Sequence, residues 1–316
     1  MISTPRPRPV RGIAAALSGV VLMSLPACSG TETPPPHRTF ATPDAAANAL
    51  ALAVKSGKLE EVTAIFGPDS QALIDSSDPA TARRNREVFT VAFGESWRLE
   101  RPDAATRVLV IGHEEWPFPI PIVQDGRAWR FDTAAGTEEI LARRIGRNEL
   151  AVIRICRTYV AAQRLYAERG HDGRPAGLYA EALRSDSGKH NGLYWPAVRG
   201  EKRSPLGDLV AAAAAAGRPV GGDGAQPTPF HGYYFRILTA QGPAAPGGAR
   251  NYLQQGGLSG GFALVAWPAL YDVTGVMTFI VNQDGVAHEK DLGADTDEAA
   301  RAMTAYDPDA TWSAVQ

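Results

Sequence analysis

A stretch near the middle of the chain has the residue spacing of one long amphipathic helix. Between Leu141 and Tyr166, seven positions recur at steps of three, four or seven residues, so they fall on one stripe of the helix. These positions are Leu141, Ile145, Val152, Cys156, Tyr159, Gln163 and Tyr166. The arginines of this stretch fall largely off the stripe, which favours a solvated face over an anion-binding site. Gly146 is the position at which we expect the helix to break.

Three shorter helices are expected before the long one. Thr42 can cap a helix whose first turn contains Pro43, and Ser56-Gly57 ends that helix. Apolar residues at helical spacing continue over residues 59–66 and again near residues 80–93. The first part of the chain therefore begins as a group of helices.

After residue 93 the apolar period changes to two, as it does in strands. The alternating pairs are Trp97 and Leu99, Val108 and Val110, Ile120 and Ile122, and Trp129 and Phe131. Asp125-Gly126 favours a hairpin turn between the last two pairs. We therefore predict an N-terminal α+β domain over residues 39–135, in which helices precede a curved antiparallel sheet, similar to the NTF2-like or cystatin-like folds.

Residues 136–316 are expected to form a second α+β domain, with the long helix packed on an antiparallel sheet. A Gly- and Pro-rich segment with one short helix at residues 206–216 leads into four strand-like runs, and residues 282–285 form a hairpin turn. The runs are residues 233–238, 262–267, 276–281 and 286–288. This order resembles the globular part of type IV pilins and pseudopilins. Unlike a pilin helix, however, this helix lies inside the chain and carries many arginines, so polymerisation through it is not expected.

Residues 1–27 have the parts of a secretory signal peptide, with three arginines before a short apolar core. That core is too short for a mature membrane-spanning helix, which needs about 20 residues. Leu25-Pro26-Ala27-Cys28 resembles the lipobox of bacterial lipoproteins. The resemblance implies cleavage after Ala27, acylation of Cys28 and, because Ser29 rather than Asp follows, placement at the periplasmic face of the outer membrane.

Residues 28–38 then read as a lipidated tether, because three consecutive prolines favour extended geometry. Without residues 1–27 the chain keeps 29 of its 32 Lys and Arg side chains against 34 acidic ones, a net charge of −5. This balance indicates no nucleic-acid partner. With Cys28 lipidated, Cys156 is the one remaining thiol, so no intramolecular disulfide is expected.

Five blocks of sequence together resemble a bacterial family known only as domain of unknown function 2950. The blocks are Trp116–Pro121, Arg144–Leu150, Gly192–Pro196, His231–Thr239 and Thr278–Gly285. The resemblance covers about residues 39–313 and implies no established activity. Members often carry an Asp- and Gly-rich, calcium-loop-like stretch after the long helix, but here residues 168–174 contain a single Asp, Asp172, near arginines. That is a poor oxygen set for calcium, so no metal is expected there.

Catalytic signatures are weak in this chain. Gly257-Leu258-Ser259-Gly260-Gly261 fits the pattern of a nucleophile elbow, but a strand rather than a helix is expected after it, which favours a hairpin connection. Cys156 lies on the apolar stripe and reads as a buried structural residue. The six histidines show no short metal-ligand spacing. We therefore assign no catalytic residue, no metal site and no cofactor.

Aromatic residues are unusually frequent in the Gly- and Pro-rich segments. Such residues can form a rigid recognition surface, although they can equally hold long loops onto the protein. The candidates for a binding surface are Trp116, Phe118, Tyr194, Trp195, His231 and Tyr233. The sequence thus favours a lipid-anchored envelope protein that binds or scaffolds an envelope protein or a glycan without catalysis. The alternatives are an envelope hydrolase using His231 or Ser259, and a pilus- or secretion-accessory subunit.

Overall fold

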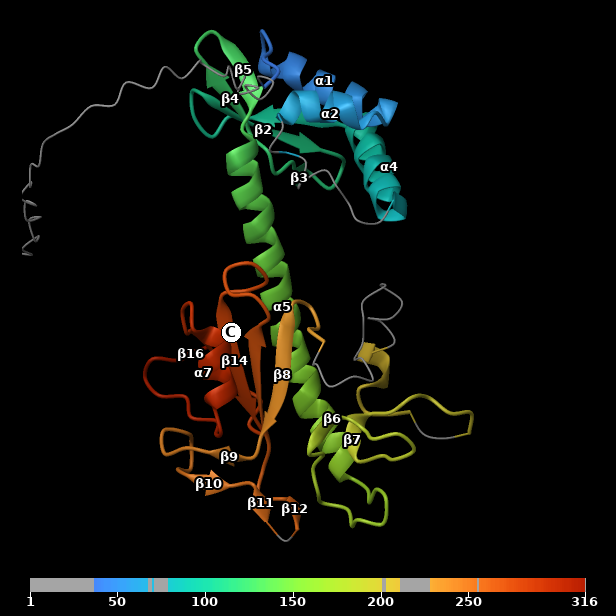
Figure 1. Cartoon of the computed structure of the whole chain (residues 1–316), viewed down its shortest axis with the longest axis vertical. Helices are drawn as coiled ribbons and strands as arrows, with labels where there is room; N and C mark the ends of the chain where they lie inside the picture. The colour runs from blue at the N-terminus through green and yellow to red at the C-terminus, as the bar shows by residue number, and fades with distance from the viewer. Residues whose placement is uncertain are drawn as a thin grey trace, which may run out of the picture. The chain divides into compact units, whose positions relative to one another are not determined.

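The computed structural model describes residues 37–67, 70, 79–200, 203–210, 228–254 and 256–315. The signal peptide, Cys28 and most of the tether lie outside these residues, as does the part of the expected 206–216 helix that follows Val210. The described chain is a mixed α+β protein with N-terminal helices, antiparallel sheets and one long helix (Figure 1). Two separate hydrophobic cores form, one before and one after the middle of that helix.

The first helices form where capping residues predict them. Helix α1 (Pro43–Ser56) begins after Thr42, whose hydroxyl accepts a hydrogen bond from the Ala45 amide at 3.1 Å, and it ends at Gly57 with φ +71°. Only glycine adopts this left-handed conformation without strain. Helices α2 (Leu59–Phe66) and α4 (Pro79–Glu95) follow. The expected helices at the start of the chain are therefore confirmed.

The first sheet follows these helices, and all its pairings are antiparallel. Its strands are β1 (Trp97–Glu100), β2 (Thr106–Ile111), β3 (Trp116–Pro117), β4 (Ile122–Asp125) and β5 (Ala128–Phe131). Their order is β1-β2-β4-β5, with β3 pairing on β2, and Asp125-Gly126 turns between β4 and β5 as expected. In β1, Trp97 and Leu99 are half-buried and the residues between and after them are exposed. One face of this strand therefore packs on the protein and the other meets water.

The first core is the set of buried apolar residues between α1, α2 and the first sheet. It consists of Phe40, Ala46, Ala47, Leu50, Ala53, Ile65, Phe66, Leu109, Ile111, Ile120, Ile122 and Phe131, with Phe89, Phe93 and Phe118 among the half-buried residues packed on it. The phenyl rings of Phe66 and Phe131 meet edge to face, with centroids 5.1 Å apart. This core contains neither cysteine nor tyrosine among its buried members.

The long helix α5 (Thr133–Ala167) is continuous, so the expected break at Gly146 is wrong. Asp132 caps its first turn, and the Thr133 hydroxyl donates to the Phe66 carbonyl at 2.6 Å. A glycine inside a helix costs only about 1 kcal/mol relative to alanine, which cannot break a helix that is packed on both sides of that residue. The predicted stripe is confirmed from Val152 onward, where its residues are buried.

The second sheet carries five antiparallel strands in the order β16-β15-β14-β13-β8. They are β8 (Tyr233–Leu238), β13 (Ala263–Pro268), β14 (Met277–Asn282), β15 (Ala287–Asp291) and β16 (Ser313–Ala314), and residues 283–286 turn between β14 and β15 as expected. Every residue of β13 is buried. Leu264 lies on the side of α5, whereas the Trp267 indole, on the opposite face, donates to Asp297 of α7 (Thr296–Ala302) at 2.8 Å. Helices therefore cover both faces of β13.

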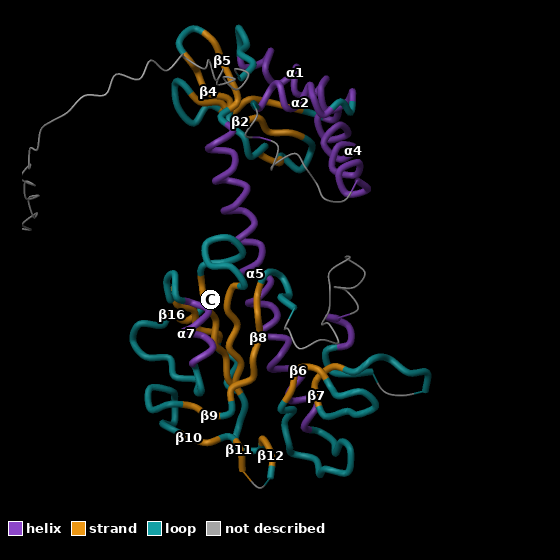
Figure 2. The backbone as a smooth tube through the Cα atoms, in the orientation of Figure 1, coloured by secondary structure: helices purple, strands orange, loops and turns teal. Residues whose placement is uncertain are grey.

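Short strands complete the second half (Figure 2). Strands β6 (Ala182–Arg184) and β7 (Gly192–Tyr194) pair in parallel, and β9 (Ala240–Gln241), β10 (Arg250–Asn251), β11 (Leu253–Gln254) and β12 (Gly257–Leu258) form two small ladders. Much of the chain between β7 and β8 is loop or lies outside the described residues.

The second core lies between α5 and the second sheet. Two of its buried polar side chains are well paired: the Tyr159 hydroxyl donates to the Ala263 carbonyl at 3.0 Å, and the Gln163 side chain exchanges two hydrogen bonds with the backbone of Ala180. Polar groups buried in this way would otherwise cost stability. Among the described helices, none combines the length and the hydrophobicity that crossing a bilayer requires.

Candidate functional site

The six aromatic and histidine candidates do not gather on one surface of the described chain. Trp116 is 45 % exposed and Phe118 is half-buried beside the first core. Trp195 and Tyr233 are only 7 % and 0 % exposed and belong to the second core. The remaining two, Tyr194 and His231, are half-buried in the second half of the chain. The structure thus places Trp116 and Phe118 at one cavity, Tyr194 at another, and Trp195 and Tyr233 in the second core, while His231 lines neither cavity.

Tyr233 is buried, and Gly275 makes room for its hydroxyl. Its hydroxyl donates to the Met277 carbonyl at 3.0 Å, and a Cβ on Gly275 would collide with that hydroxyl. Gly232, immediately before β8, has φ +73°, and a Cβ at this position would lie 2.8 Å from the Asn148 side chain. Burial, and then the nearby Glu149 carboxylate, raise the pKa of Tyr233. Tyr233 is therefore part of the internal packing rather than of an exposed surface.

Glu149 joins α5 to the second sheet, a role that we did not predict. Its Oε1 accepts hydrogen bonds from the backbone amides of Val276 and Met277 at 2.9 and 3.0 Å. On the same turn of α5, the Asn148 side chain donates to the Thr274 carbonyl at 2.8 Å. Burial, and then repulsion from Glu149, raise the pKa of Glu289. The sequence signal that could have pointed to Glu149 was the family-like block Arg144–Leu150. In the structure this block meets two other segments: the block that begins at His231, and the start of β14.

A groove opens beside the first core at Trp116 and Phe118. Its volume is about 640 Å³, and its walls come from α4, β2, β3 and the segment that follows β3. Its apolar lining is Phe66, Val88, Phe89, Ala92, Ile111, Trp116, Phe118, Pro119, Ile120 and Ile140. Helix α4 faces the groove with positions three or four residues apart, from Asn85 to Glu95, as an amphipathic helix does.

Trp116 is held in place at this groove. The Arg143 guanidinium lies 5.6 Å from the centroid of the indole ring, donates to the Pro117 carbonyl at 2.8 Å and pairs with Glu139 at 2.7 Å. Phe118 meets the same indole edge to face, with centroids 6.0 Å apart. An exposed indole that is fixed by its neighbours loses little conformational entropy when it binds a partner. The polar residues among the described lining, Asn85, Glu95 and Glu114, include two carboxylates, and Arg143 is the cation beside them, on the Trp116 indole.

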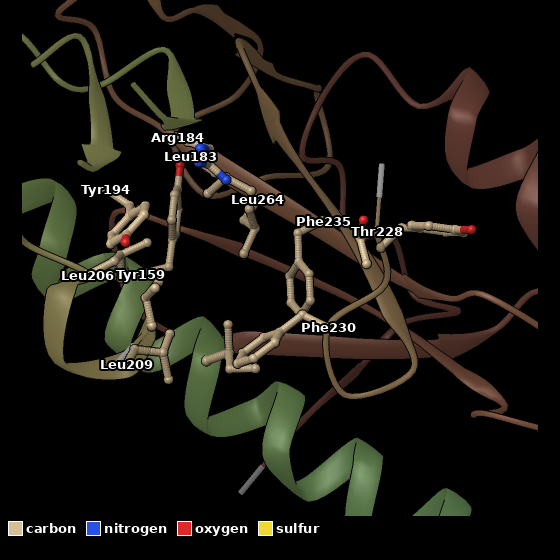
Figure 3. A pocket seen from close by; sticks show the side chains of 13 residues that line it. Tyr159, Leu183, Arg184, Tyr194, Leu206, Leu209, Thr228, Phe230, Phe235 and Leu264 are labelled. Atoms are coloured by element: carbon tan, nitrogen blue, oxygen red, sulfur yellow. The ribbon is translucent and has the colours of Figure 1, made fainter. Parts of the chain in front are cut away.

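A second cavity lies in the other half of the chain, between α5, β8, β13 and the β6–β7 pair (Figure 3). Its volume is about 260 Å³. The lining is Ile155, Tyr159, Leu183, Arg184, Tyr194, Leu206, Leu209, Val210, Thr228, Phe230, Tyr234, Phe235 and Leu264. Nearly all these side chains are apolar or aromatic, and Arg184 is the one charged residue among them.

Arg184 lies at the edge of this cavity because of the parallel pairing of β6 and β7. Arg184 and Tyr194 are partners in the register, and the guanidinium lies 5.9 Å from the centroid of the tyrosine ring. Figure 3 shows Arg184 beside Leu183 and Leu264, with Phe230 and Phe235 lining another part of the cavity. Arg184 and Tyr194 are ten positions apart in the sequence, and only Tyr194 was predicted from the sequence as a candidate binding residue. No local pattern signals this pairing, which arises from strand register.

The structure separates the residues that a hydrolase would need. His231 precedes β8 at its Tyr233 end, where β8 pairs with Pro268, whereas Ser259 precedes β13 at its Ala263 end. Strands rise about 3.3 Å per residue, so the two ends of this strand pair lie about 17 Å apart along the sheet. The Ser259 hydroxyl donates to the Gln254 carbonyl at 3.2 Å, and the segment after it is a strand. A nucleophile elbow needs a helix there.

Cys156 and the acidic and histidine side chains give no other centre in the described part of the chain. Burial raises the pKa of the Cys156 thiol to about 12, which keeps it protonated and unreactive. In the loop compared with a calcium loop, Asp172 accepts a hydrogen bond from the His190 amide at 2.7 Å. Within the described residues, no three His, Cys, Asp or Glu side chains come together as metal ligands.

Fold and cavities together define the class: a mixed α+β protein with two hydrophobic cores and an apolar cavity at each. The chain matches the family described as "Protein of unknown function (DUF2950)" over residues 37–315, and it belongs to that family. Neither the curated proteins nor the solved structures contain a match to it.

Proposed function

We propose that this chain is a lipid-anchored envelope protein that binds another envelope protein without catalysis, through the groove at Trp116. The observation that carries the proposal is an exposed indole, fixed by Arg143, at the mouth of an apolar groove of about 640 Å³. Tryptophan is among the residues that most often dominate the energy of protein interfaces. Exposed apolar residues beside a groove are typical of interaction sites.

The chemistry of the groove favours an apolar protein segment that carries a basic residue. Its walls are aromatic and aliphatic, whereas a glycan would require many hydrogen-bonding groups around its hydroxyls. The carboxylates of Glu95 and Glu114 complement a Lys or Arg that follows the apolar anchor. The exposed side chains of Val88 and Val91 extend the apolar surface along α4.

The lipid anchor rests on the lipobox-like residues that end at Cys28. In this interpretation the acyl chains hold the protein at the membrane, the Pro-rich residues act as the tether, and the folded part meets partners within reach of the periplasmic face of the outer membrane. A Cys28→Ser chain should then be released into the soluble fraction and keep its unprocessed precursor. Membrane retention with normal processing would contradict the anchor.

The finer fold resemblances belong to the same proposal. An NTF2-like or cystatin-like first half and a pilin-like second half both suit binding roles. A hydrolase is less well supported, because His231 and Ser259 lie at opposite ends of the β8–β13 pair. A pilus- or secretion-accessory role rests only on the order of the long helix and the second sheet.

The groove is tested with displayed random 12-residue peptides, selected on the full chain and counter-selected on Trp116→Ala. We expect enrichment of peptides with apolar anchors and one Lys or Arg. An enriched peptide should lose about 30-fold in affinity on Trp116→Ala by calorimetry, as for an interface residue of large effect. It should also lose a few-fold on Glu114→Gln, because that variant removes one complementary charge.

Leu52→Ala is the matched control, because Leu52 is 69 % exposed on α1 and does not line the groove. It should leave the peptide affinity unchanged. No enriched peptide family, or equal binding to the wild type and to Trp116→Ala, would refute the proposal. Trp195 is excluded from the test because it is buried, so its removal would disturb the second core.

A further inference from the structure

In the second half of the chain, one side of the long helix α5 is packed and the opposite side meets water. Ile155 and Tyr159 belong to the packed side, where α5 contacts β7, β13, β14 and β15 (Figure 1). Positions three, four or seven residues apart fall on one side of a helix. One such row on the opposite side is exposed, and we call it the arginine face. Its residues are Arg147, Leu150, Arg154, Ala161 and Arg164.

The hydrogen bonds described for the arginine face do not neutralise its charge. Arg147 donates to the Arg143 carbonyl at 3.2 Å. Arg164 donates to the Gln283 carbonyl at 2.8 Å. A carbonyl is a neutral acceptor, so both guanidiniums remain fully positive toward water. From residue 150 to its end at Ala167, α5 contains no Asp or Glu.

The spacing of charges on this helix differs from that of an ordinary solvated face. Opposite charges three or four residues apart stabilise a helix, and like charges at that spacing destabilise it. Neither Arg147 nor Arg154 has an acidic residue three or four positions away in either direction, whereas Arg154 and Arg157 are three positions apart. The chain without residues 1–27 has a net charge of −5, so these arginines are concentrated against the overall charge. Helix stability alone does not favour this arrangement.

Apolar side chains lie among these arginines. Leu150, between Arg147 and Arg154 in the row, is 58 % exposed. Leu165, next to Arg164, is 46 % exposed. An acidic protein or a nucleic acid is bound mainly by charge and hydrogen bonds, whereas the surface of a bilayer accepts both kinds of side chain. Its phosphates pair with cations, and its acyl boundary takes up apolar side chains.

We propose that the arginine face binds the surface of a bilayer that carries anionic headgroups. From Arg147 to Arg164 the row extends about 26 Å at 1.5 Å per residue, which suits an extended surface better than one small anion. Guanidiniums donate to the lipid phosphates, while Leu150 and Leu165 reach the edge of the acyl region. This contact goes beyond the proposed function, because it requires neither the acyl chains of the anchor nor the groove at Trp116.

The test uses the chain from Ser29 onward, which lacks the signal peptide and Cys28. It keeps both cores, whose residues begin at Phe40. This chain is sedimented with phosphatidylcholine vesicles that contain either no phosphatidylglycerol or one-third phosphatidylglycerol. We expect binding to the phosphatidylglycerol vesicles alone, and weaker binding as salt screens the charges. Equal binding to both kinds of vesicle, or binding to neither, would overturn the proposal.

Substitutions separate the charged from the apolar part of the contact. Arg154→Gln should weaken binding about fivefold, which corresponds to about 1 kcal/mol per arginine at an anionic surface. Leu150→Ser should weaken it several-fold through the lost apolar contact. The matched control is Arg86→Gln, which removes an exposed arginine of α4 and should leave binding unchanged. Thermal unfolding establishes that each variant is folded.

Two outcomes of this series would contradict a bilayer contact at the arginine face. A loss on Arg86→Gln equal to that on Arg154→Gln would mean a general attraction of the chain to negative charge. Unchanged binding of Leu150→Ser, together with equally tight binding of the wild type to soluble polyglutamate, would assign the face to an acidic macromolecule.

A fluorescent label shows which face meets the vesicle. Leu150→Cys is labelled with nitrobenzoxadiazole, and Cys156 is 0 % exposed, so the label attaches at residue 150. Its emission should shift to shorter wavelength on phosphatidylglycerol vesicles, because the label enters a less polar environment. The same label on Leu52→Cys, at an exposed position of α1, should show no shift. An equal or larger shift at residue 52 would place the bilayer elsewhere and overturn the proposal, without bearing on the peptide test.

Discussion

The edge strand of the first sheet and a central strand of the second sheet differ in how many of their faces are covered. In the first sheet, the edge strand β1 alternates between half-buried and exposed residues, so one of its faces meets water. In the second, all six residues of β13 are buried, with α5 on one side and α7 on the other. Beside the first sheet the Trp116 indole remains at the surface, whereas Trp267 of β13 and Phe279 of β14 are part of the interior of the second half.

This difference could be read from strand sequences, although not from aromatic content. Residues 97–100, Trp-Arg-Leu-Glu, alternate in polarity, whereas residues 263–268, Ala-Leu-Val-Ala-Trp-Pro, are apolar throughout. Alternation is typical of a half-exposed strand and a continuous apolar run of one buried on both faces. Aromatic residues near alternating strands are therefore the better candidates for a binding surface.

The largest expected contrast comes from truncating one aromatic residue beside each sheet. Phe279 of β14 is 0 % exposed, so Phe279→Ala should lower the free energy of unfolding by about 3–5 kcal/mol. Trp116→Ala, at a 45 % exposed residue, should cost about 1 kcal/mol or less. Urea titrations measure both values. Equal losses would mean that Trp116 is packed as tightly as Phe279.

A pair of glutamates on α5 sharpens the comparison. Glu149→Ala leaves the amides of Val276 and Met277 without their acceptor and should cost about 2–3 kcal/mol. Glu149→Gln keeps an acceptor oxygen and should cost clearly less. Glu139→Ala removes only a half-exposed pair with Arg143, which is worth about 0.3–0.5 kcal/mol. Thermal and urea unfolding of the three variants test this order. If Glu139→Ala lowered the free energy of unfolding as much as Glu149→Ala does, the order would be contradicted.

Two glycines of α5 should respond to alanine with opposite signs. A Cβ at Gly136 would lie 2.5 Å from Ile120 Cγ1, so Gly136→Ala should destabilise the protein by about 1–3 kcal/mol. Gly146 has open space around it, and Gly146→Ala should stabilise by about 0.5–1 kcal/mol because alanine favours the helix. Unfolding midpoints give both signs. Destabilisation by Gly146→Ala would mean that this turn of α5 is packed after all.

The smallest effect is a pH dependence that belongs to the second core alone. Burial raises the pKa of Cys156 from an ordinary value of 9.0 to about 12, so the folded state holds a proton that the unfolded chain releases. Stability from this group is complete below pH 9 and declines as the pH rises toward 12. Between pH 9 and 10 the wild type should lose about 1 kcal/mol more than Cys156→Ala does. Urea titrations at several pH values measure this loss, and equal slopes of stability against pH for the wild type and Cys156→Ala would contradict the prediction. The first core cannot contribute such an effect, because it has no buried cysteine or tyrosine.

Much of the fold could be predicted because its signals are local. Thr42 and Gly57 bound α1, Asp125-Gly126 turns one hairpin, and the stripe from Val152 to Tyr166 faces a core. Each of these features depends on residues within a few positions of one another. The expected break at Gly146 was wrong because the packing of α5 on both sides outweighs the small intrinsic cost of one glycine.

The cavities could be predicted only in part, because their residues meet through long-range packing. Trp116 and Phe118 were identified from composition and do lie together at the groove. Trp195 was chosen by the same criterion, but it is buried in the second core. Arg184 faces Tyr194 through the register of two parallel strands, and Glu149 meets Val276 across 127 residues. No single-sequence pattern specifies such contacts.

The contact between Gly275 and Tyr233 has a consequence for how this family can vary. Any side chain at residue 275 would strike the Tyr233 hydroxyl, and no rotation of the ring avoids a Cβ that is fixed to the backbone. Relatives that keep tyrosine at the equivalent of 233 should therefore keep glycine at the equivalent of 275, and the two should change together. The equivalent of Gly146, with nothing within 4 Å of its would-be Cβ, should drift freely to other helix-forming residues. In this family, glycines that are retained should thus lie where neighbouring atoms leave no room for a Cβ, and glycines that are replaced should lie where there is space for one.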